Sequence, residues 1–313
     1  MADPDKGAAF LDANRKPRLS SPKAHLAEVR DLWRRGLPPG DRTGWPSVDQ
    51  FYSVAPGQMT IVTGWPSSGK SEWLDALLIN LARQNWKIAM FSFENQPVSL
   101  HITKMLEKWT GKPFREGPNE RINLAEVDEY SDELEQHFSF ADTSVGSLTA
   151  TDCIEQAEPW LAQFPDSKRG LVIDPWNELE HWRPNNLSET EYVSQTLSMV
   201  RNWARRNKVH VWIVAHPAKM RREEGKLPIP KPDMISGSQH WWNKADCCIT
   251  VFRDFEKHES PDIDIHIQKV RFRHIGKLGV ATLRYNIVTG QYRELPRVVS
   301  DQARDYKRRS SGE

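Results

Sequence analysis

Strand-like runs that alternate with helical runs predict an α/β fold with a mainly parallel sheet flanked by helices. The strand-like runs are 59–63, 87–93, 170–174, 209–215 and 247–252, and helical spacing of apolar residues occurs at 71–84, 97–110, 149–163 and 188–207. That order is typical of strand–helix–strand units, whose strands pair in parallel. Two more runs, 263–272 and 279–285, flank the letters IGK and predict a β-hairpin at the end of the sheet.

The composition is that of a globular protein able to bury a core. The chain has 313 residues, of which 38% are hydrophobic and 27% charged, with a net charge of +1. No global field therefore attracts nucleic acid, although a local basic lining stays possible. The 3 cysteines fit neither a disulfide framework nor a zinc site with four ligands. Because there is no transmembrane or targeting segment, we expect a cytoplasmic protein with no membrane partner.

We expect one α/β domain with short appendages. Residues 1–21 are polar and predicted to be flexible, and residues 22–45 are predicted to be a linker helix and loop. Ser21 and Pro22 have the types expected at a helix N-cap and first position, and the helix would end at Gly36. The domain itself would span 46–296, followed by a basic disordered tail over 297–313.

Residues 64–71, GWPSSGKS, match the phosphate-binding pattern G-x-x-x-x-G-K-[ST]. Gly64 and Gly69 allow the backbone N–H groups to wrap closely around a phosphate. Lys70 would bind the β- and γ-phosphates, and the Ser71 hydroxyl would ligate Mg²⁺. The alternative is a glycine-rich turn without function. The pattern predicts binding of ATP, or another NTP or dNTP, with Mg²⁺ by Gly64, Ser67, Ser68, Gly69, Lys70 and Ser71.

Two carboxylates follow predicted strands and should lie at the same edge of the sheet, where open α/β sheets bind ligands. Asp174 ends the strand 170–174, where it can hold Mg²⁺ directly or through water, or instead cap the following turn. Glu94 follows the strand 87–93, where it could orient and deprotonate an attacking water. The alternative for Glu94 is an acidic residue that starts the next helix.

Cationic and titratable residues occur near the later strands. His216 follows the strand 209–215 and could sense a γ-phosphate, although a histidine at a strand end is more often structural. Lys269, Arg271 and Arg273 alternate, which would place them on one face of a strand. They are either the solvated charges of a protected edge strand or a finger that reaches the γ-phosphate of a neighbouring subunit.

Taken together, these segments resemble the hexameric DnaB-type replicative helicases, with a RecA-like ATPase core. The likeness is nearest to the helicase half of phage primase–helicases and to mitochondrial Twinkle, and it extends over roughly residues 22–295. Its landmarks stand in the family's order: TGWPSVDQF, GWPSSGKS, FSFEN, LVIDPWNE, IVAHP, SGSQHWWNKAD, and KVRF followed by RYNIVTGQY. The most discriminating of these are FSFE, the strand-end histidine, and K-x-R-F with the later YN-x-x-TG.

The resemblance implies a role for each catalytic candidate. Lys70 and Ser71 would bind phosphate and Mg²⁺, and Asp174 would be the acidic residue of the metal site. Glu94 would be the catalytic base. His216 would be the γ-phosphate sensor that is coupled to DNA.

The resemblance also implies that part of the nucleotide site comes from a second subunit. Arg271 would be an arginine finger donated in trans, with Lys269 beside it. Arg253, seven residues after Asp246, and Tyr285 would pack around the nucleotide base. The expected assembly is a homo-hexamer.

Loops lining a central channel contact single-stranded DNA in this family. The corresponding positions here, implied by the resemblance, are Arg183, Lys219, Arg221, Arg222, Lys226, Gly237 and Ser238. Cations in the stretch that follows His216 would neutralise the DNA backbone, or would serve solubility alone. Trp241 and Trp242 could stack on bases, but packing in the core or at an interface is the better interpretation.

The expected function is an NTP-dependent replicative DNA helicase that moves 5′→3′ on single-stranded DNA and unwinds duplex. No primase module precedes the helicase region in this sequence, so we expect a separate primase and other replication proteins as partners, in a bacterial host cytosol if the gene is phage-borne or mobile. The alternative is a RecA-like ATPase without unwinding activity, such as a recombination mediator, a helicase loader or a signalling ATPase. A P-loop kinase would need a lid and an acceptor pocket, for which no sequence is evident, and Glu94 disfavours an inactive scaffold.

Overall fold

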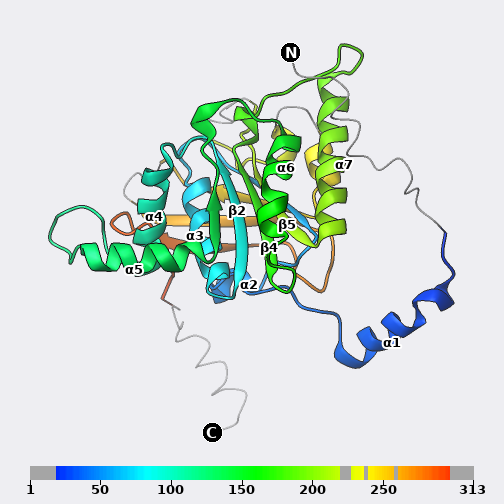
Figure 1. Cartoon of the computed structure of the whole chain (residues 1–313), viewed down its shortest axis with the longest axis horizontal. Helices are drawn as coiled ribbons and strands as arrows, with labels where there is room; N and C mark the ends of the chain where they lie inside the picture. Colours follow the sequence, from blue (N-terminus) through cyan, green and yellow to red (C-terminus); the bar gives the residue numbers. More distant parts are fainter. Residues whose placement is uncertain (1–18, 219–226, 236–238, 257–259, 297–313) are drawn as a thin grey trace, which may run out of the picture.

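The computed structural model describes residues 19–218, 227–235, 239–256 and 260–296, and these form one nine-stranded sheet (Figure 1). Its order is β3-β2-β4-β5-β1-β6-β7-β8-β9. The strands are β1 (Met59–Thr63), β2 (Trp86–Ser92), β3 (Phe138–Phe140), β4 (Lys168–Asp174), β5 (Val209–Val214), β6 (Cys247–Phe252), β7 (Asp262–Val270), β8 (Gly279–Tyr285) and β9 (Tyr292–Glu294).

The sheet is mixed, with a parallel part and an antiparallel end. All strands from β3 to β6 pair in parallel, whereas β7, β8 and β9 are antiparallel to their neighbours. The predicted α/β class and the hairpin at the end of the sheet are therefore confirmed. Sequence patterns missed β3 and β9, because three-residue strands show no recognisable period.

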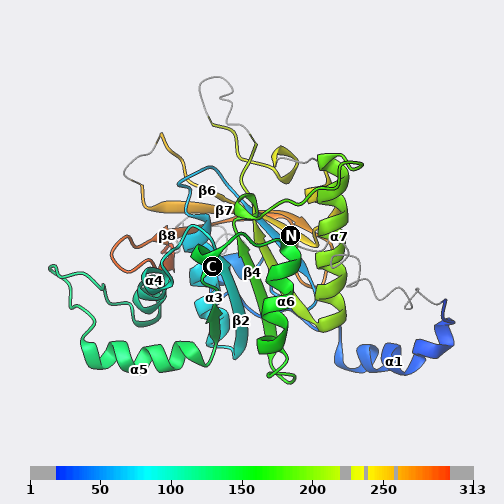
Figure 2. The same ribbon diagram turned by 45° about the horizontal axis from the view of Figure 1, so that its top comes forward.

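Helices cover both faces of the parallel part, as Figures 1 and 2 show. Alternate residues of β2 belong to two separate cores: Ile88 and Met90 pack with helix α3, while Ala89 and Phe91 pack with α6 and α7. Burial on both faces explains why the parallel strands are mostly apolar along their length. The helices are α1 (Leu26–Arg35), α2 (Pro46–Asp49), α3 (Lys70–Ala82), α4 (Val98–Thr110), α5 (Leu124–Glu135), α6 (Ala150–Leu161), α7 (Glu189–Asn207) and α8 (His240–Lys244), with 3₁₀ turns η1 (Pro22–His25), η2 (Thr143–Val145), η3 (Trp176–Glu178) and η4 (Pro232–Met234).

The N-terminal helix differs from the single helix predicted from Pro22 to Gly36. A 3₁₀ turn precedes α1. Ser21 is the N-cap of that turn and Pro22 its first residue, although the Ser21 side chain makes no capping hydrogen bond. Helix α1 extends away from the sheet and buries none of its residues; Trp33 is 85% exposed (Figure 1). The proposed division into linker, domain and tail stays a prediction. None of the described helices is long and apolar enough to span a membrane.

Candidate active site

The phosphate-binding loop leaves β1 and enters α3 through a conformation that glycine permits. Gly69 is the N-cap of α3 and has a left-handed backbone, with φ of 88°. A Cβ atom on Gly64 would lie 2.3 Å from the carbonyl oxygen of Val251 and 2.5 Å from the Ser68 hydroxyl, so only glycine fits there. The loop is thus shaped so that backbone N–H groups and the start of α3 can face an anion.

Lys70 is turned inward onto its own loop. Its Nζ atom donates a hydrogen bond to the carbonyl oxygen of Trp65 at 3.1 Å, and the residue is 6% exposed. Burial lowers the pKa of Lys70, against the opposing effect of Asp174 and Glu94. A buried, poorly hydrated ammonium group in a phosphate-binding loop is suited to pair with the negative charge of a triphosphate.

Asp174 stands at the carboxyl end of β4 as a buried acid with an unused ligand atom. The residue is 4% exposed, and its Oδ1 atom has no hydrogen-bond partner among the described residues. Burial raises the pKa of Asp174 to about 7, while a hydrogen bond with the Ser71 hydroxyl acts in the opposite direction. An unpartnered carboxylate oxygen beside a serine hydroxyl fits a hard cation such as Mg²⁺. In the described part of the chain no cluster of three acidic, histidine or cysteine side chains could hold a metal, so phosphate and water would supply the other ligands.

Glu94 and His216 meet at the same edge of the sheet. The Oε1 atom of Glu94 lies 4.0 Å from Nε2 of His216, and the Glu94 side chain is 52% exposed. Burial, followed by the charge of Lys70, lowers the pKa of His216, so its imidazole is neutral near pH 7. The backbone N–H of His216 donates to Oδ1 of Asn177 at 2.9 Å, which ties the end of β5 to the loop after β4.

The structure therefore gathers four predicted residues at the carboxyl ends of neighbouring strands. Glu94 follows β2, Asp174 ends β4, His216 follows β5, and Lys70 follows β1; these strands are adjacent in the order β2-β4-β5-β1. The charges of Asp174 and Glu94 act on Lys70, and the charge of Lys70 acts on His216, so the four side chains lie in one environment. Such an edge is the usual place for a ligand in an open α/β sheet.

Arg271 lies at the opposite edge of the sheet. Its Nε atom pairs at 2.8 Å with Oδ1 of Asp246, which directly precedes β6 and is fully buried. The carboxylate of Asp246 also accepts the backbone N–H of Met59, the first residue of β1. Because β1 carries the chain from this edge to the phosphate-binding loop, its five residues separate the two by roughly 15 Å.

One sequence prediction about this region is wrong. Alternation was expected to place Lys269, Arg271 and Arg273 on one face of a strand, but β7 ends at Val270. Val270 pairs with Cys247, the first residue of β6, so no partner strand remains for the residues beyond it. Arg271 instead folds back onto the Asp246 carboxylate, and Lys269 donates to the backbone carbonyl of Trp242.

Tyr292 joins the group around the phosphate-binding loop, although sequence analysis did not single it out. Its hydroxyl donates to the carbonyl oxygen of Gly69 at 3.3 Å, and its ring lies 5.1 Å from that of Tyr285. Burial raises the pKa of Tyr285 to about 12, with Arg253 close enough to oppose this. Tyr292 ends the landmark RYNIVTGQY, but nothing in those letters indicates that its side chain folds back to the loop.

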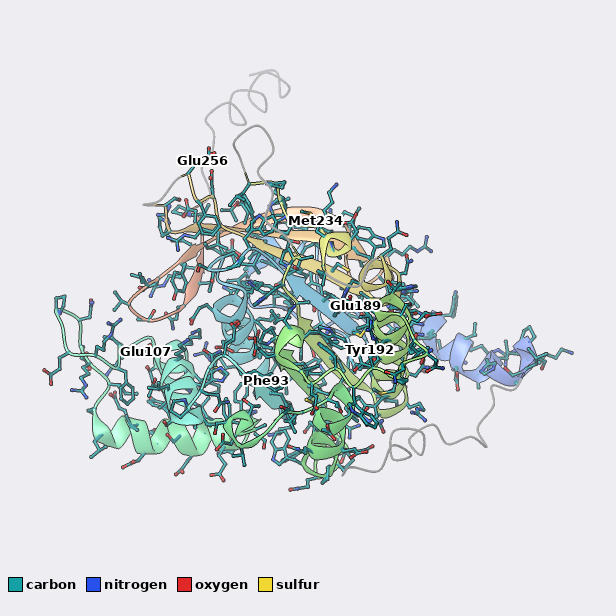
Figure 3. The ribbon with its side chains drawn as sticks, turned by 90° about the horizontal axis from the view of Figure 1, so that it is seen from above. Phe93, Glu107, Glu189, Tyr192, Met234 and Glu256 are labelled. Carbon is teal, nitrogen blue, oxygen red and sulfur yellow. The ribbon has the colours of Figure 1, made fainter. Side chains whose placement is uncertain are left out.

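Of the predicted DNA contacts, only Arg183 falls in the described residues. Arg183 lines a cavity of about 360 Å³ next to η3 and the start of α7, together with Glu189 and Tyr192, which are labelled in Figure 3. Trp241 is fully buried and packs edge-on against Trp176 at 5.1 Å, in agreement with a packing role. The positions outside the described residues are Lys219, Arg221, Arg222, Lys226, Gly237 and Ser238.

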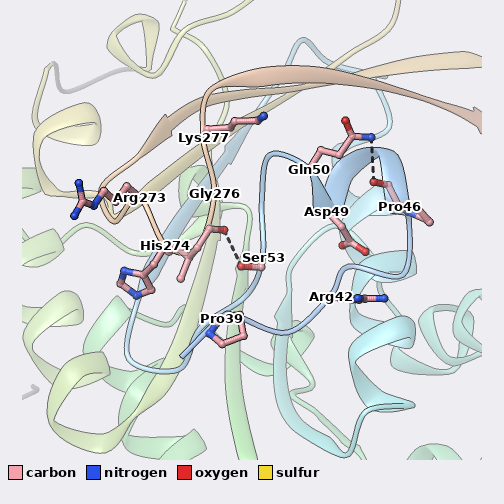
Figure 4. A pocket seen from close by; sticks show the side chains of 12 residues that line it. Pro39, Arg42, Pro46, Asp49, Gln50, Ser53, Arg273, His274, Gly276 and Lys277 are labelled. Atoms are coloured by element: carbon pink, nitrogen blue, oxygen red, sulfur yellow. Dashed lines mark hydrogen bonds between the residues drawn. The ribbon is translucent and has the colours of Figure 1, made fainter. Parts of the chain in front are cut away.

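A larger cavity, of about 610 Å³, lies away from the phosphate-binding loop. Segments 39–53 and 273–277 form its walls, and Arg42, Arg273 and Lys277 contribute cations to it (Figure 4). Its lining residues 273–277 come shortly after Arg271 in the sequence, and none of the residues gathered at the carboxyl edge lines it. The volume of this cavity is therefore no argument for a nucleotide site here; the chemistry of the loop and its carboxylates favours the carboxyl edge instead.

Comparison with known proteins shows the family. Residues 40–294 match the family model of the DnaB-like helicase C-terminal domain. The chain belongs to this family. A Twinkle homolog protein, chloroplastic/mitochondrial, from Arabidopsis thaliana is 39% identical over 300 residues, which are 92% of this chain and 42% of the homolog. The chain thus spans less than half the length of that relative.

Two solved structures share the fold. The ATPase domain of G40P superposes with a TM-score of 0.75 at 17% identity, covering 89% of this chain and 100% of that one. A DnaB-like replicative helicase, solved to show its interactions with primase, gives 0.73 at 16% identity, covering 88% and 69%. The predicted RecA-like fold and the resemblance to DnaB-type helicases are both confirmed.

Proposed function

We propose that this DnaB-like domain hydrolyses ATP, or another NTP or dNTP, and uses the energy to move 5′→3′ along single-stranded DNA and unwind duplex. The observation that carries the proposal is the split arrangement of the site. Lys70, Asp174, Glu94 and His216 gather at one edge of the sheet, while Arg271 lies at the other. A complete site would then form between two copies of the chain, which supports a homo-oligomeric ring, proposed to be a hexamer.

The residues at the carboxyl edge would act in sequence on the triphosphate. Lys70 would leave the carbonyl of Trp65 and bind the β- and γ-phosphates. Asp174 would give up its proton and, with Ser71, hold Mg²⁺, which when bound neutralises charge on the phosphate oxygens. Glu94, half exposed and directed toward His216, would orient the attacking water and accept its proton.

His216 would connect the state of the nucleotide to the DNA. Its backbone bond to Asn177 links the end of β5 to the loop that carries Arg183. The chain after His216 contains four basic residues over 219–226. A change at the γ-phosphate could therefore reach two proposed DNA-contacting segments. Cations there would bind the DNA backbone with a strong dependence on salt.

Arg271 would complete the neighbouring subunit's site. Its side chain is 32% exposed and is held at the amino edge by Asp246, too far across the sheet to serve the phosphate-binding loop of its own chain. An arginine supplied in trans stabilises the charge that develops during phosphoryl transfer. Lys269 would stand beside it, while Arg253 and Tyr285, near Gly69 through Tyr292, would pack around the base.

Mixing two inactive variants tests the proposal. Lys70→Ala removes the phosphate ligand and Arg271→Ala removes the finger, so each protein alone should be inactive. Mixed rings contain some interfaces with both residues intact, and ATPase activity should therefore reappear in the presence of single-stranded DNA. Failure to recover activity at any mixing ratio would refute the assignment in trans.

A second measurement addresses the DNA and partner parts of the proposal. Single-stranded DNA should stimulate hydrolysis by an oligomer whose mass corresponds to six chains. A monomer without stimulation would favour the RecA-like ATPase that does not unwind. We further propose a separate primase as partner, because one structural relative was solved with its interactions with primase.

A further inference from the structure

Lys104, on α4, bridges the start of the phosphate-loop helix and the loop that carries Glu94. Its Nζ atom lies 3.2 Å from Oε1 of Glu72 and donates to Oδ1 of Asn95 at 2.8 Å. Glu72 directly follows Ser71, and Asn95 directly follows Glu94. One side chain therefore spans the two segments that the proposed reaction must hold in register.

The Glu94 carboxylate has little to orient it directly. In the described residues its one polar contact is His216 at 4.0 Å, and it accepts no hydrogen bond. Its direction must therefore come from the backbone on either side. The N–H of Phe93 donates to the Asp174 carbonyl at 2.8 Å, and Nδ2 of Asn95 donates to the Ser92 hydroxyl at 3.0 Å.

The other end of the bridge is firmly anchored. Oε2 of Glu72 lies 2.6 Å from Nζ of Lys108, a residue of α4 whose side chain is 2% exposed. This buried ion pair holds the Glu72 carboxylate against α4. Lys104 itself is 41% exposed. An ion pair this exposed adds no more than about 1 kcal/mol to stability, so a role in folding alone would be small.

We propose that Lys104 is a positioning residue for Glu94. Through Asn95 it fixes the loop after β2 relative to Glu72 and hence to the first turn of α3, where the phosphates would lie. The inference rests on the proposed role of Glu94 as the base. It adds a residue that touches neither nucleotide nor metal and yet sets the rate of the chemical step.

The test is Lys104→Met in the full chain, assayed as DNA-stimulated ATPase activity. Misplacing a catalytic group by about 1 Å can cost up to about a hundredfold, so we expect kcat to fall by roughly 10- to 100-fold. KM should stay within about twofold, because Lys104 does not touch the phosphate ligands, and the melting temperature should be unchanged. Lys104→Arg, which retains the charge and the donor, should recover most of the rate.

A matched control and a second background make the test specific. Lys112→Met removes another lysine with two ion pairs, to Glu120 and Glu126, but with no contact to the Glu94 loop, and it should behave as wild type. In a Glu94→Gln background, Lys104→Met should lower the residual rate no further. Should Lys104→Met fold poorly, Asn95→Ala cuts the same link and should give the same fall in kcat.

The outcomes separate this inference from the proposed function. A wild-type kcat in Lys104→Met, an equal loss in Lys112→Met, or a further loss in the Glu94→Gln background would each overturn the positioning role. Wild-type hydrolysis by Glu94→Gln alone would instead remove Glu94 as the base, and the positioning role would fall with it.

Discussion

Replacing Asp174 by Asn should stabilise the protein while abolishing its activity. Burial raises the pKa of Asp174 from an ordinary value of 3.8 to about 7, so the folded chain holds a proton that the unfolded chain releases. The ionised form is therefore disfavoured by folding. The difference between the two pKa values corresponds to about 4 kcal/mol, and we expect about 2–4 kcal/mol to be realised after local relaxation.

The sign and the pH window follow from those two values. Below about pH 4 the Asp174 carboxyl is protonated in both the folded and the unfolded state, so it does not change the free energy of unfolding. Between pH 4 and 7 the unfolded state alone ionises, so the wild type loses up to about 1.4 kcal/mol of stability per pH unit. Above pH 7 both states are ionised, so the loss of stability no longer grows with pH. Asparagine does not titrate, so the advantage of Asp174→Asn should grow from pH 4 to 7 and then level off.

Urea unfolding at several pH values, without nucleotide or Mg²⁺, measures this difference. Tryptophan fluorescence suits the assay because the chain has 13 tryptophans. Asp142→Asn is the control, since Asp142 is exposed and hydrogen bonds from Ser144 lower its pKa, so no gain should grow with pH. Stability curves of Asp174→Asn and wild type that stay parallel from pH 5 to 8 would refute the argument.

Two further predictions concern other buried groups. Burial lowers the pKa of His210 to about 4, so between pH 6.5 and 4 the unfolded state binds a proton that the folded state does not, and the wild type should lose stability as the pH falls. In the same urea titration, the stability of His210→Gln should fall less steeply below pH 6.5. An equally steep fall would contradict the assignment. Tyr292→Phe removes the hydrogen bond to Gly69, and since a neutral bond contributes about 0.5–1.5 kcal/mol, nucleotide affinity should fall by roughly two- to tenfold. Equilibrium titration with a fluorescent ATP analogue measures this, and unchanged affinity would remove Tyr292 from the site.

The order of strands and helices could be predicted from sequence because the central strands are buried on both faces. β1, β2 and β5 are buried along their whole length and are mostly apolar for that reason, and the turns between them are marked by glycine and polar residues. Helix α5 was missed because it is mostly solvent-facing and buries only Leu134. A helix held by its Asn123–Glu126 capping box rather than by an apolar stripe gives a weak periodic signal.

The residues of the candidate site likewise differ in whether the sequence could place them. Lys70, Asp174, Glu94 and His216 could be placed together because each follows a parallel strand, and such strand ends share one edge. Tyr292 and Lys104 could not, because their contacts depend on how a later turn and a helix pack against the loop. The place of Arg271 also depends on three-dimensional pairing, since β7 ends where β6 begins.

The buried charges of the two edges differ in a way that bears on mechanism. Asp246, at the amino edge, is fully buried but saturated: it accepts Arg205, Arg271 and a backbone N–H, so its charge is compensated within the chain. Asp174, equally buried at the carboxyl edge, has an unpartnered oxygen and a raised pKa. Of these two buried aspartates, the one at the carboxyl edge therefore carries the unfavourable interaction. Binding of a cation with nucleotide would relieve it there, and would thereby couple ligand binding to the ionisation of Asp174.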